Sequence, residues 1–217
     1  MTSKEIEAHV DQYQLEKRIV KVDFSDEKIE KALFLDIDGV IQPFSEKRFD
    51  YVENKESMDA LYKSLEEQFG VDYRQFGKYD LTAAYYDWDK DAVEEIRRIL
   101  DVTGAKIVVS SDWRDLYNQF ALPYFFLIYD LMKYLYGYLP IYYDTNYASH
   151  RVGYEHFKTD RGRDIIKYLK VHPHIKKWVA IDDYRDMIYD IPDNFVHTYP
   201  KVTKDEADRC IQILGEK

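Results

Sequence analysis

Two aspartates separated by one residue follow a short apolar run and precede a glycine in the segment KALFLDIDGV. Asp36 and Asp38 are of a residue type that is unfavourable in strands, and burying two neighbouring carboxylates without a partner is costly. A hard cation such as Mg²⁺ would offset their repulsion because it binds oxygen ligands. With such an ion present, one carboxylate could attack phosphorus and the other could move a proton. The pair therefore indicates metal-assisted phosphoryl chemistry.

Two later apolar runs also end in polar side chains. KIVV is followed by Ser110 and Ser111, and KKWVAI is followed by Asp182 and Asp183. The carboxyl ends of parallel strands meet at one edge of an open sheet, where ligands bind. We therefore expect these oxygens to converge with those of the first pair in one crevice. For an isolated pair of aspartates, a solvated loop or a helix cap is the alternative interpretation.

The elements that must position these residues are predicted from hydrophobic periodicity and from stop signals. Helices are expected where apolar residues recur three and four positions apart before a glycine or proline, and strands where short apolar runs occur. Residues 125–135 also show helical spacing. The alternation of strands and helices favours an α/β fold with a parallel sheet. The expected strands cover about residues 31–37, 106–110, 138–144, 176–183 and 194–199, and the main expected helices about 57–70, 89–104, 161–173 and 203–215.

Three of these segments, taken in order, resemble motifs of the haloacid dehalogenase-like (HAD) superfamily. FLDIDGV resembles its first motif, IVVSS its second and VAIDD its fourth. The resemblance covers about residues 31–215 and implies a Rossmann-like parallel sheet flanked by helices, with small helical insertions. More narrowly, these segments resemble small HAD domains, some of which are linked to nucleic-acid repair. The expected organisation is a single domain over residues 1–217, with a core at about 31–44 and 86–215, a helical insertion at about 45–85 and an N-terminal helical arm at 1–25.

The resemblance implies a role for each motif residue of the first two motifs. Asp36 would be the nucleophile that takes the phosphoryl group, and it would also bind the metal. Asp38 would be the general acid and base, and its backbone carbonyl would help to hold Mg²⁺. Ser110 would donate a hydrogen bond to a phosphate oxygen, with Ser111 as the alternative. Arg114 could contact substrate phosphate or form an ion pair with an acid of the core.

The later motifs are expected to complete the metal site and to supply a positive charge. Asp182 and Asp183 would bind the metal, with Asp183 favoured as the direct ligand. The third motif of the family needs a lysine or arginine near the start of a helix, where the helix dipole also favours an anion. The segment FKTDRGRDII offers Lys158, Arg161 and Arg163 for this role. Arg161 is favoured because it lies just inside the expected helix start.

Composition limits the partners that this protein could have. A formal net charge of −10 argues against a protein that coats nucleic acid. A single cysteine, Cys210, excludes an internal disulfide and favours a reducing compartment, so a cytoplasmic location is expected. The charged N-terminus has no apolar signal core. The most apolar stretch, residues 123–143, contains charged residues, glycine and proline, so we expect no membrane span.

The sequence therefore predicts a Mg²⁺-dependent phosphatase that hydrolyses a phosphomonoester through an aspartyl-phosphate, with a small phosphorylated molecule as the expected substrate. A second hypothesis is an enzyme that processes nucleic-acid ends, such as a 3′-phosphatase. It rests on the narrower resemblance, on the tyrosine-rich segment 117–147, and on residues 151–177, which hold eight lysines and arginines against three acids. A third hypothesis is a non-catalytic phosphate-binding module. Substrate identity and oligomeric state stay open.

Overall fold

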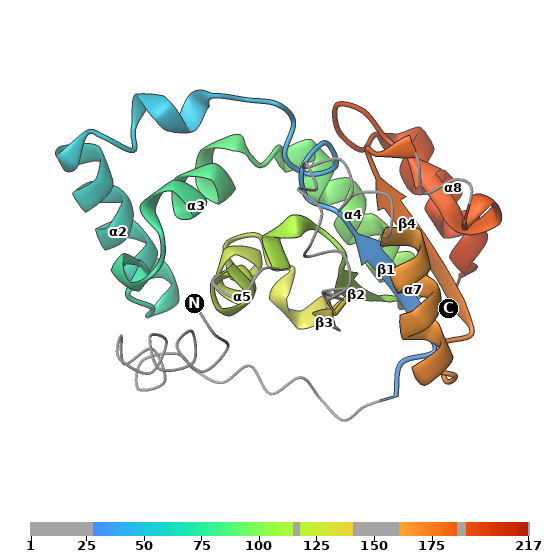
Figure 1. The fold of residues 1–217 in the computed structure, drawn as a ribbon. Coiled ribbons are helices and arrows are strands. Elements are labelled where there is room, and N and C mark those ends of the chain that lie inside the picture. The colour runs from blue at the N-terminus through green and yellow to red at the C-terminus, as the bar shows by residue number, and fades with distance from the viewer. Residues whose placement is uncertain (1–27, 115–117, 141–160, 186–189, 217) are drawn as a thin grey trace, which may run out of the picture.

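The computed structural model describes residues 28–114, 118–140, 161–185 and 190–216. Within these ranges, five strands form one sheet in the order β3-β2-β1-β4-β5, and every neighbouring pair is parallel (Figure 1). The α/β Rossmann-like fold predicted from the sequence is therefore confirmed. The strands are β1 (Lys31–Leu35), β2 (Lys106–Val109), β3 (Leu135–Tyr138), β4 (Lys177–Asp182) and β5 (Phe195–His197).

Side chains of β1 alternate between two hydrophobic cores, one on each face of the sheet. Leu33 and Leu35 belong to the larger core, whereas Ala32 and Phe34 belong to the smaller one. This alternation follows from the two-residue period of a strand. All four side chains are fully buried, as expected for a central strand of a parallel sheet covered on both faces.

Helices cover both faces of the sheet (Figure 1). Apolar residues of α4 and α8 pack in the larger core, and Ile165 and Tyr168 of α7 pack in the smaller one. Asp89 caps α4 by accepting a hydrogen bond from the Ala92 amide at 3.0 Å. The α-helices are α2 (Lys55–Phe69), α3 (Lys78–Thr82), α4 (Lys90–Thr103), α5 (Asn118–Ile128), α7 (Arg161–Val171) and α8 (Lys204–Leu214).

Short helical turns connect several of these elements. They are the 3₁₀ turns η2 (Lys47–Asp50), η3 (Tyr73–Gln75), η5 (Asp112–Arg114), η6 (Met132–Tyr134) and η8 (Pro192–Asn194), and the π-helical turn η4 (Ala83–Asp87). The segment between β1 and α4 contains α2 and α3, which lie beside α5 and away from β4 and β5 in Figure 1. An ion pair connects the start of this segment to its end, because Arg48 Nη1 lies 2.6 Å from Oδ2 of the buried Asp87.

The third strand differs from the sequence prediction. Helical spacing predicted a helix that reaches Leu135, followed by a strand at about 138–144. Instead α5 ends at Ile128, and β3 begins at Leu135. The reason is local, because Asp130 has a φ of 56°, a left-handed conformation that interrupts a right-handed helix. The apolar residues after Asp130 belong to the 3₁₀ turn η6 and to the strand β3.

Some predictions fall on residues outside the described ranges. The expected arm at 1–25 lies within residues 1–27, and both Lys158 and the second half of the strand expected at about 138–144 lie within residues 141–160. Among the helices that the structure does describe, none has the length and apolar character needed to cross a membrane.

Candidate active site

Asp36 lies immediately after β1 and is 3% exposed. Its amide still donates to the carbonyl of Ile181 in β4 at 3.1 Å, which fixes the backbone of Asp36 against the neighbouring strand. Asp182 ends β4, and Asp183 follows it. One carboxylate oxygen from each of Asp36, Asp182 and Asp183 lies within 4.8 Å of the others. The convergence expected at the carboxyl edge of the sheet is therefore present for these three acids.

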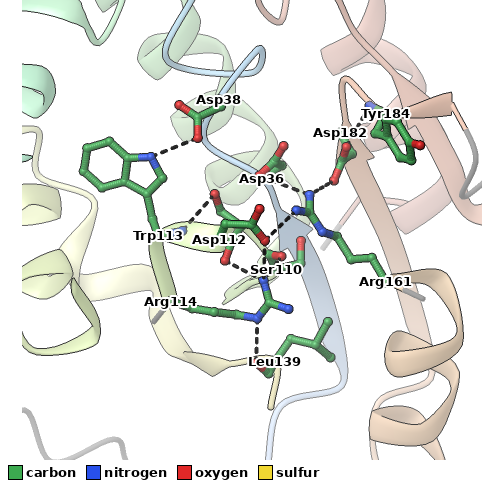
Figure 2. A network of polar contacts seen from close by, with 11 residues as sticks. Asp36, Asp38, Ser110, Asp112, Trp113, Arg114, Leu139, Arg161, Asp182 and Tyr184 are labelled. Carbon is green, nitrogen blue, oxygen red and sulfur yellow. Dashed lines mark hydrogen bonds and ion pairs between the residues drawn. The ribbon is translucent and has the colours of Figure 1, made fainter. Parts of the chain in front are cut away.

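Arg161 faces this acidic cluster from the first turn of α7 (Figure 2). Its buried guanidinium contacts Asp182, lies 3.3 Å from Asp36 Oδ1 through Nη1, and lies 3.0 Å from Asp112 Oδ1 through Nη2. Burial alone would lower the pKa of Arg161, but the carboxylates of Asp182, Asp36 and Asp112 raise it. The guanidinium is therefore held charged beside the predicted nucleophile, where it can face an incoming anion.

Asp182 is fully buried, and both of its carboxylate oxygens have partners. Oδ2 accepts from Arg161, and Oδ1 accepts the amide of Tyr184 at 2.8 Å. Burial and the nearby Asp36 raise the pKa of Asp182, while Arg161 opposes that rise. In this arrangement Asp182 orients Arg161.

Asp38 lies apart from this cluster on the loop after β1, and two side chains hold its carboxylate. Trp113 Nε1 donates to Oδ2 at 3.1 Å, and Gln42 Nε2 donates to Oδ1 at 2.8 Å. Burial and, to a smaller extent, repulsion from Asp36 raise the pKa of Asp38 to about 6, whereas the hydrogen bond from Trp113 lowers it. A carboxyl group with such a pKa can both donate and accept a proton near neutral pH.

We expect the stability of the metal-free protein to depend on pH through Asp38. The protonated carboxyl contributes stability that is fully present below its ordinary pKa of 3.8 and is lost as pH rises through about 6. Asp38→Asn cannot ionise, so between about pH 4 and pH 7.5 the wild type should lose about 2–3 kcal/mol relative to this variant. Urea unfolding in EDTA at several pH values measures the difference. A difference that stays constant with pH would contradict the prediction.

Gln42 can accommodate the Asp38→Asn substitution. Its Oε1 is buried and has no hydrogen-bond partner among the described residues. Turning the Gln42 amide would let Oε1 accept from the new amide of Asp38→Asn, because the two ends of a glutamine amide have nearly the same shape.

The segment after β2 supplies two buried serines and a buried arginine. Ser110 extends the sheet by donating its amide to the Leu35 carbonyl at 2.9 Å. The Arg114 guanidinium donates to the carbonyls of Ser110, Ser111 and Leu139 at 2.5, 2.6 and 2.9 Å, whereas its nearest acid oxygen, from Asp112, is 3.7 Å away. Burial and the nearby Arg161 lower the pKa of Arg114 to about 10. The structure thus places Arg114 where it shapes the backbone around the serines.

Gly39 allows the loop that carries Asp38 to approach the loop that carries Asp183. Its φ is 71°, in the left-handed region that favours glycine, and an added Cβ would lie 2.5 Å from Asp183 Cβ. A real side chain cannot approach another atom so closely. The glycine of the DxDG segment is therefore explained by both its backbone conformation and its contact with the predicted metal ligand.

Gly39→Ala is expected to lower the unfolding free energy by about 2–4 kcal/mol, because strain and overpacking add at this position. Gly70→Ala is a matched control, since Gly70 has a φ of 68° but an added Cβ would have nothing within 4 Å. It should cost only about 1 kcal/mol. Urea unfolding of both variants measures the difference, and equal losses would show that the approach to Asp183 is unimportant.

Sequence reasoning missed three partners at this site. It did not identify Gln42 or Trp113 as hydrogen-bond donors to Asp38, or Asp112 as an ionic partner of Arg161. The only available signal was Trp113, because a buried indole N–H usually needs an acceptor. The alternative third-motif residue, Lys158, lies outside the described residues, so its position relative to Asp36 stays a prediction.

The acidic cluster has the donor set for a hard divalent cation, since all three groups are carboxylates. Comparison with protein families matches residues 32–207 to the family described as "HAD domain in Swiss Army Knife RNA repair proteins". Comparison with curated proteins and with solved structures gave no match.

Proposed function

We propose that this chain, which belongs to the family of HAD domains in Swiss Army Knife RNA repair proteins, is a Mg²⁺-dependent phosphatase that acts through an aspartyl-phosphate on Asp36. HAD hydrolase chemistry follows from the family, and the metal, the phosphomonoester and the residue roles are our proposal. The observation that carries it is the position of Asp36. Its buried carboxylate lies among acids that could share a cation, beside a buried arginine, and two residues before an acid with a pKa of about 6.

In the first proposed step, a carboxylate oxygen of Asp36 attacks phosphorus. The new O–P bond forms as the bond to the ester oxygen breaks, and Asp38 donates its proton to the leaving alcohol. In the second step Asp38 takes a proton from water, and the water oxygen attacks phosphorus. The bond to Asp36 then breaks, which releases inorganic phosphate and regenerates both carboxyl groups.

Other residues would bind the phosphoryl group during both steps. The Arg161 guanidinium would balance negative charge on the phosphoryl oxygens, because it is already held beside Asp36. Ser110, with Ser111 as the alternative, would donate to a phosphoryl oxygen. Arg114 would support this contact through the serine carbonyls, with a direct contact to substrate as the alternative.

Asp36 and Asp183, together with the Asp38 carbonyl, are the groups that we propose to hold Mg²⁺. Asp182 belongs to the same cluster, but its oxygens already accept from Arg161 and from the Tyr184 amide, so we favour Asp183 as the direct ligand. When bound, Mg²⁺ would offset the negative charge of the carboxylates and of the phosphoryl group.

A phosphorylated nucleic-acid end is a second candidate substrate beside a small phosphorylated molecule. The match to HAD domains of RNA repair proteins favours it. Hydrolysis of a 3′-phosphorylated oligonucleotide, compared with that of free nucleotides and sugar phosphates, would distinguish the two substrate classes.

Metal removal tests the proposed chemistry. We expect the purified chain to hydrolyse the phosphomonoester p-nitrophenyl phosphate with Mg²⁺ and to lose this activity in EDTA. Asp183→Asn should raise the Mg²⁺ concentration needed for half-maximal rate about 10-fold or more. Asp193→Asn, which changes an exposed acid on η8, is the matched control and should leave that concentration unchanged.

Two results would contradict the proposal. Full activity in EDTA would exclude the metal. If every phosphoester tested with Mg²⁺ is left intact although all the acids are present, the third hypothesis, a non-catalytic phosphate-binding module, would replace it.

A further inference from the structure

Two aromatic rings are exposed next to each other at the carboxyl edge of the sheet. Phe44 and Tyr199 are 69% and 67% exposed, which is more than almost all other large hydrophobic side chains of the described residues. Their ring centroids lie 5.7 Å apart, and the ring planes are inclined by 43°. Phe44 follows β1 and Tyr199 follows β5, so chain segments far apart in sequence bring the rings together. We call these two residues the aromatic pair.

An open, shallow pocket of about 380 Å³ reaches from Tyr199, one residue of the aromatic pair, to Asp183, one residue of the acidic cluster. Asp183, Tyr184, Arg185, His197 and Tyr199 line it. Its volume falls within the range of about 300–1,000 Å³ that is usual for small-ligand sites. Because Asp183 belongs both to this pocket and to the acidic cluster, a molecule whose phosphate is at Asp36 can extend toward Tyr199.

Arg185 and His197 are the basic side chains that line the pocket, and both lie in segments next to Asp183. His197 Nε2 lies 3.1 Å from the Asp183 carbonyl and 3.3 Å from Arg185 Nε, so the end of β5 is held against the loop after β4. The register of the sheet gives the same arrangement, since His197 pairs with Asp182. An exposed arginine beside exposed aromatic rings suits a ligand that carries both phosphate and a flat ring system.

We infer that the aromatic pair is a docking site for the terminal nucleobase of a single-stranded RNA whose end phosphate is placed at Asp36. This inference rests on the nucleic-acid end as the substrate of the proposed phosphatase. The base stacks on Tyr199 and Phe44, and Arg185 contacts the adjoining backbone phosphate. A single strand is required because a base in a duplex has its faces covered by its neighbours. A small phosphorylated molecule without a flat ring gains nothing from this site.

The test compares two substrates in each variant. One is a short single-stranded RNA with a 3′-phosphate, and the other is acetyl phosphate, which has no ring to stack. In Tyr199→Ala and in Phe44→Ala, the ratio of kcat/KM for the RNA to that for acetyl phosphate should fall about 5- to 50-fold, mainly through KM. Tyr199→Trp keeps a stacking surface and should restore most of this ratio.

Phe120→Ala is the matched control. Phe120 is an exposed aromatic residue on α5, and α5 precedes β3, the strand at the opposite edge of the sheet from β5. This variant should leave the ratio unchanged. Thermal unfolding of every variant shows whether it is folded. A second measurement follows the fluorescence anisotropy of labelled 3′-phosphorylated RNA with Asp36→Asn protein, in which Tyr199→Ala should weaken binding by a similar factor. A blunt duplex with the same end should bind more weakly than the single strand.

The outcomes separate this inference from the proposed function. If both substrates are hydrolysed but neither the ratio nor RNA binding changes in Tyr199→Ala and Phe44→Ala, the docking site is wrong and the phosphatase proposal stands. If the wild type hydrolyses neither substrate, the phosphatase proposal is wrong. The anisotropy measurement then still decides the docking site, because binding does not require turnover.

Discussion

Asp36→Asn is expected to lower the rate of phosphomonoester hydrolysis by at least about 10⁴-fold, because the asparagine amide cannot act as the attacking group. The substitution keeps the shape of the side chain, and it removes one negative charge from a buried site that also holds Asp182. The fold should therefore persist, and the loss should appear in kcat. Steady-state assays with p-nitrophenyl phosphate, a phosphomonoester, and Mg²⁺ measure the effect.

A trapping experiment identifies the attacked residue directly. Wild-type protein is incubated with acetyl phosphate that is radiolabelled on phosphorus, and the reaction is stopped with acid. The protein should retain label that hydroxylamine removes, as expected for an acyl phosphate. Asp36→Asn protein should retain none.

Asp112→Asn is the matched control for these experiments. Asp112 also contacts Arg161, but from an exposed position, so its loss should reduce turnover less than about 10-fold. Full activity of Asp36→Asn would show that the nucleophile is another residue.

Arg161→Met is expected to lower the unfolding free energy of the metal-free protein by about 3–5 kcal/mol. Among the described residues, its guanidinium is the ionic partner of Asp36 and of Asp182, and both carboxylates are buried. Methionine fills much of the volume of the side chain but leaves those charges without their cation. Urea unfolding in EDTA measures the loss.

Arg163→Met provides the comparison. Arg163 lies two residues further along α7, its side chain is 61% exposed, and its Nε lies 3.9 Å from Asp190 Oδ2. The same change there should alter stability by less than about 0.5 kcal/mol. If Arg161→Met does not fold, Arg161→Lys serves instead, because it keeps the charge but loses the two-pronged contact, and it should lie between wild type and the methionine variant. Equal effects at Arg161 and Arg163 would show that the buried ion pairs do not stabilise the fold.

The order of the motifs and the class of the fold were predictable from the sequence. Strand runs such as ALFL and WVAI are continuous and apolar because both faces of their strands are buried, and this feature is local. The placement of Asp36 and Asp182 at strand ends followed from the same runs. Parallel pairing then brought the strand ends to one edge, which a fold-class argument could anticipate. The predictions failed where a local pattern had two interpretations, as at residues 125–135, where one left-handed residue, Asp130, divides an apparent helix from a strand.

Side-chain partnerships at the site required the tertiary structure. Trp113 binds Asp38 across 75 positions, and Arg161 contacts Asp36 from the start of a helix that is far along the chain. Such contacts leave no periodic pattern in the sequence, because they depend on the strand order β3-β2-β1-β4-β5 and on how α7 packs against the sheet. The same holds for Phe44 and Tyr199, which meet only because β1 and β5 end at the same edge. The sequence by itself thus determined which chemical groups are present and at which strand ends they lie. Only the tertiary structure decided which of these groups touch, because contact is set by packing between distant segments.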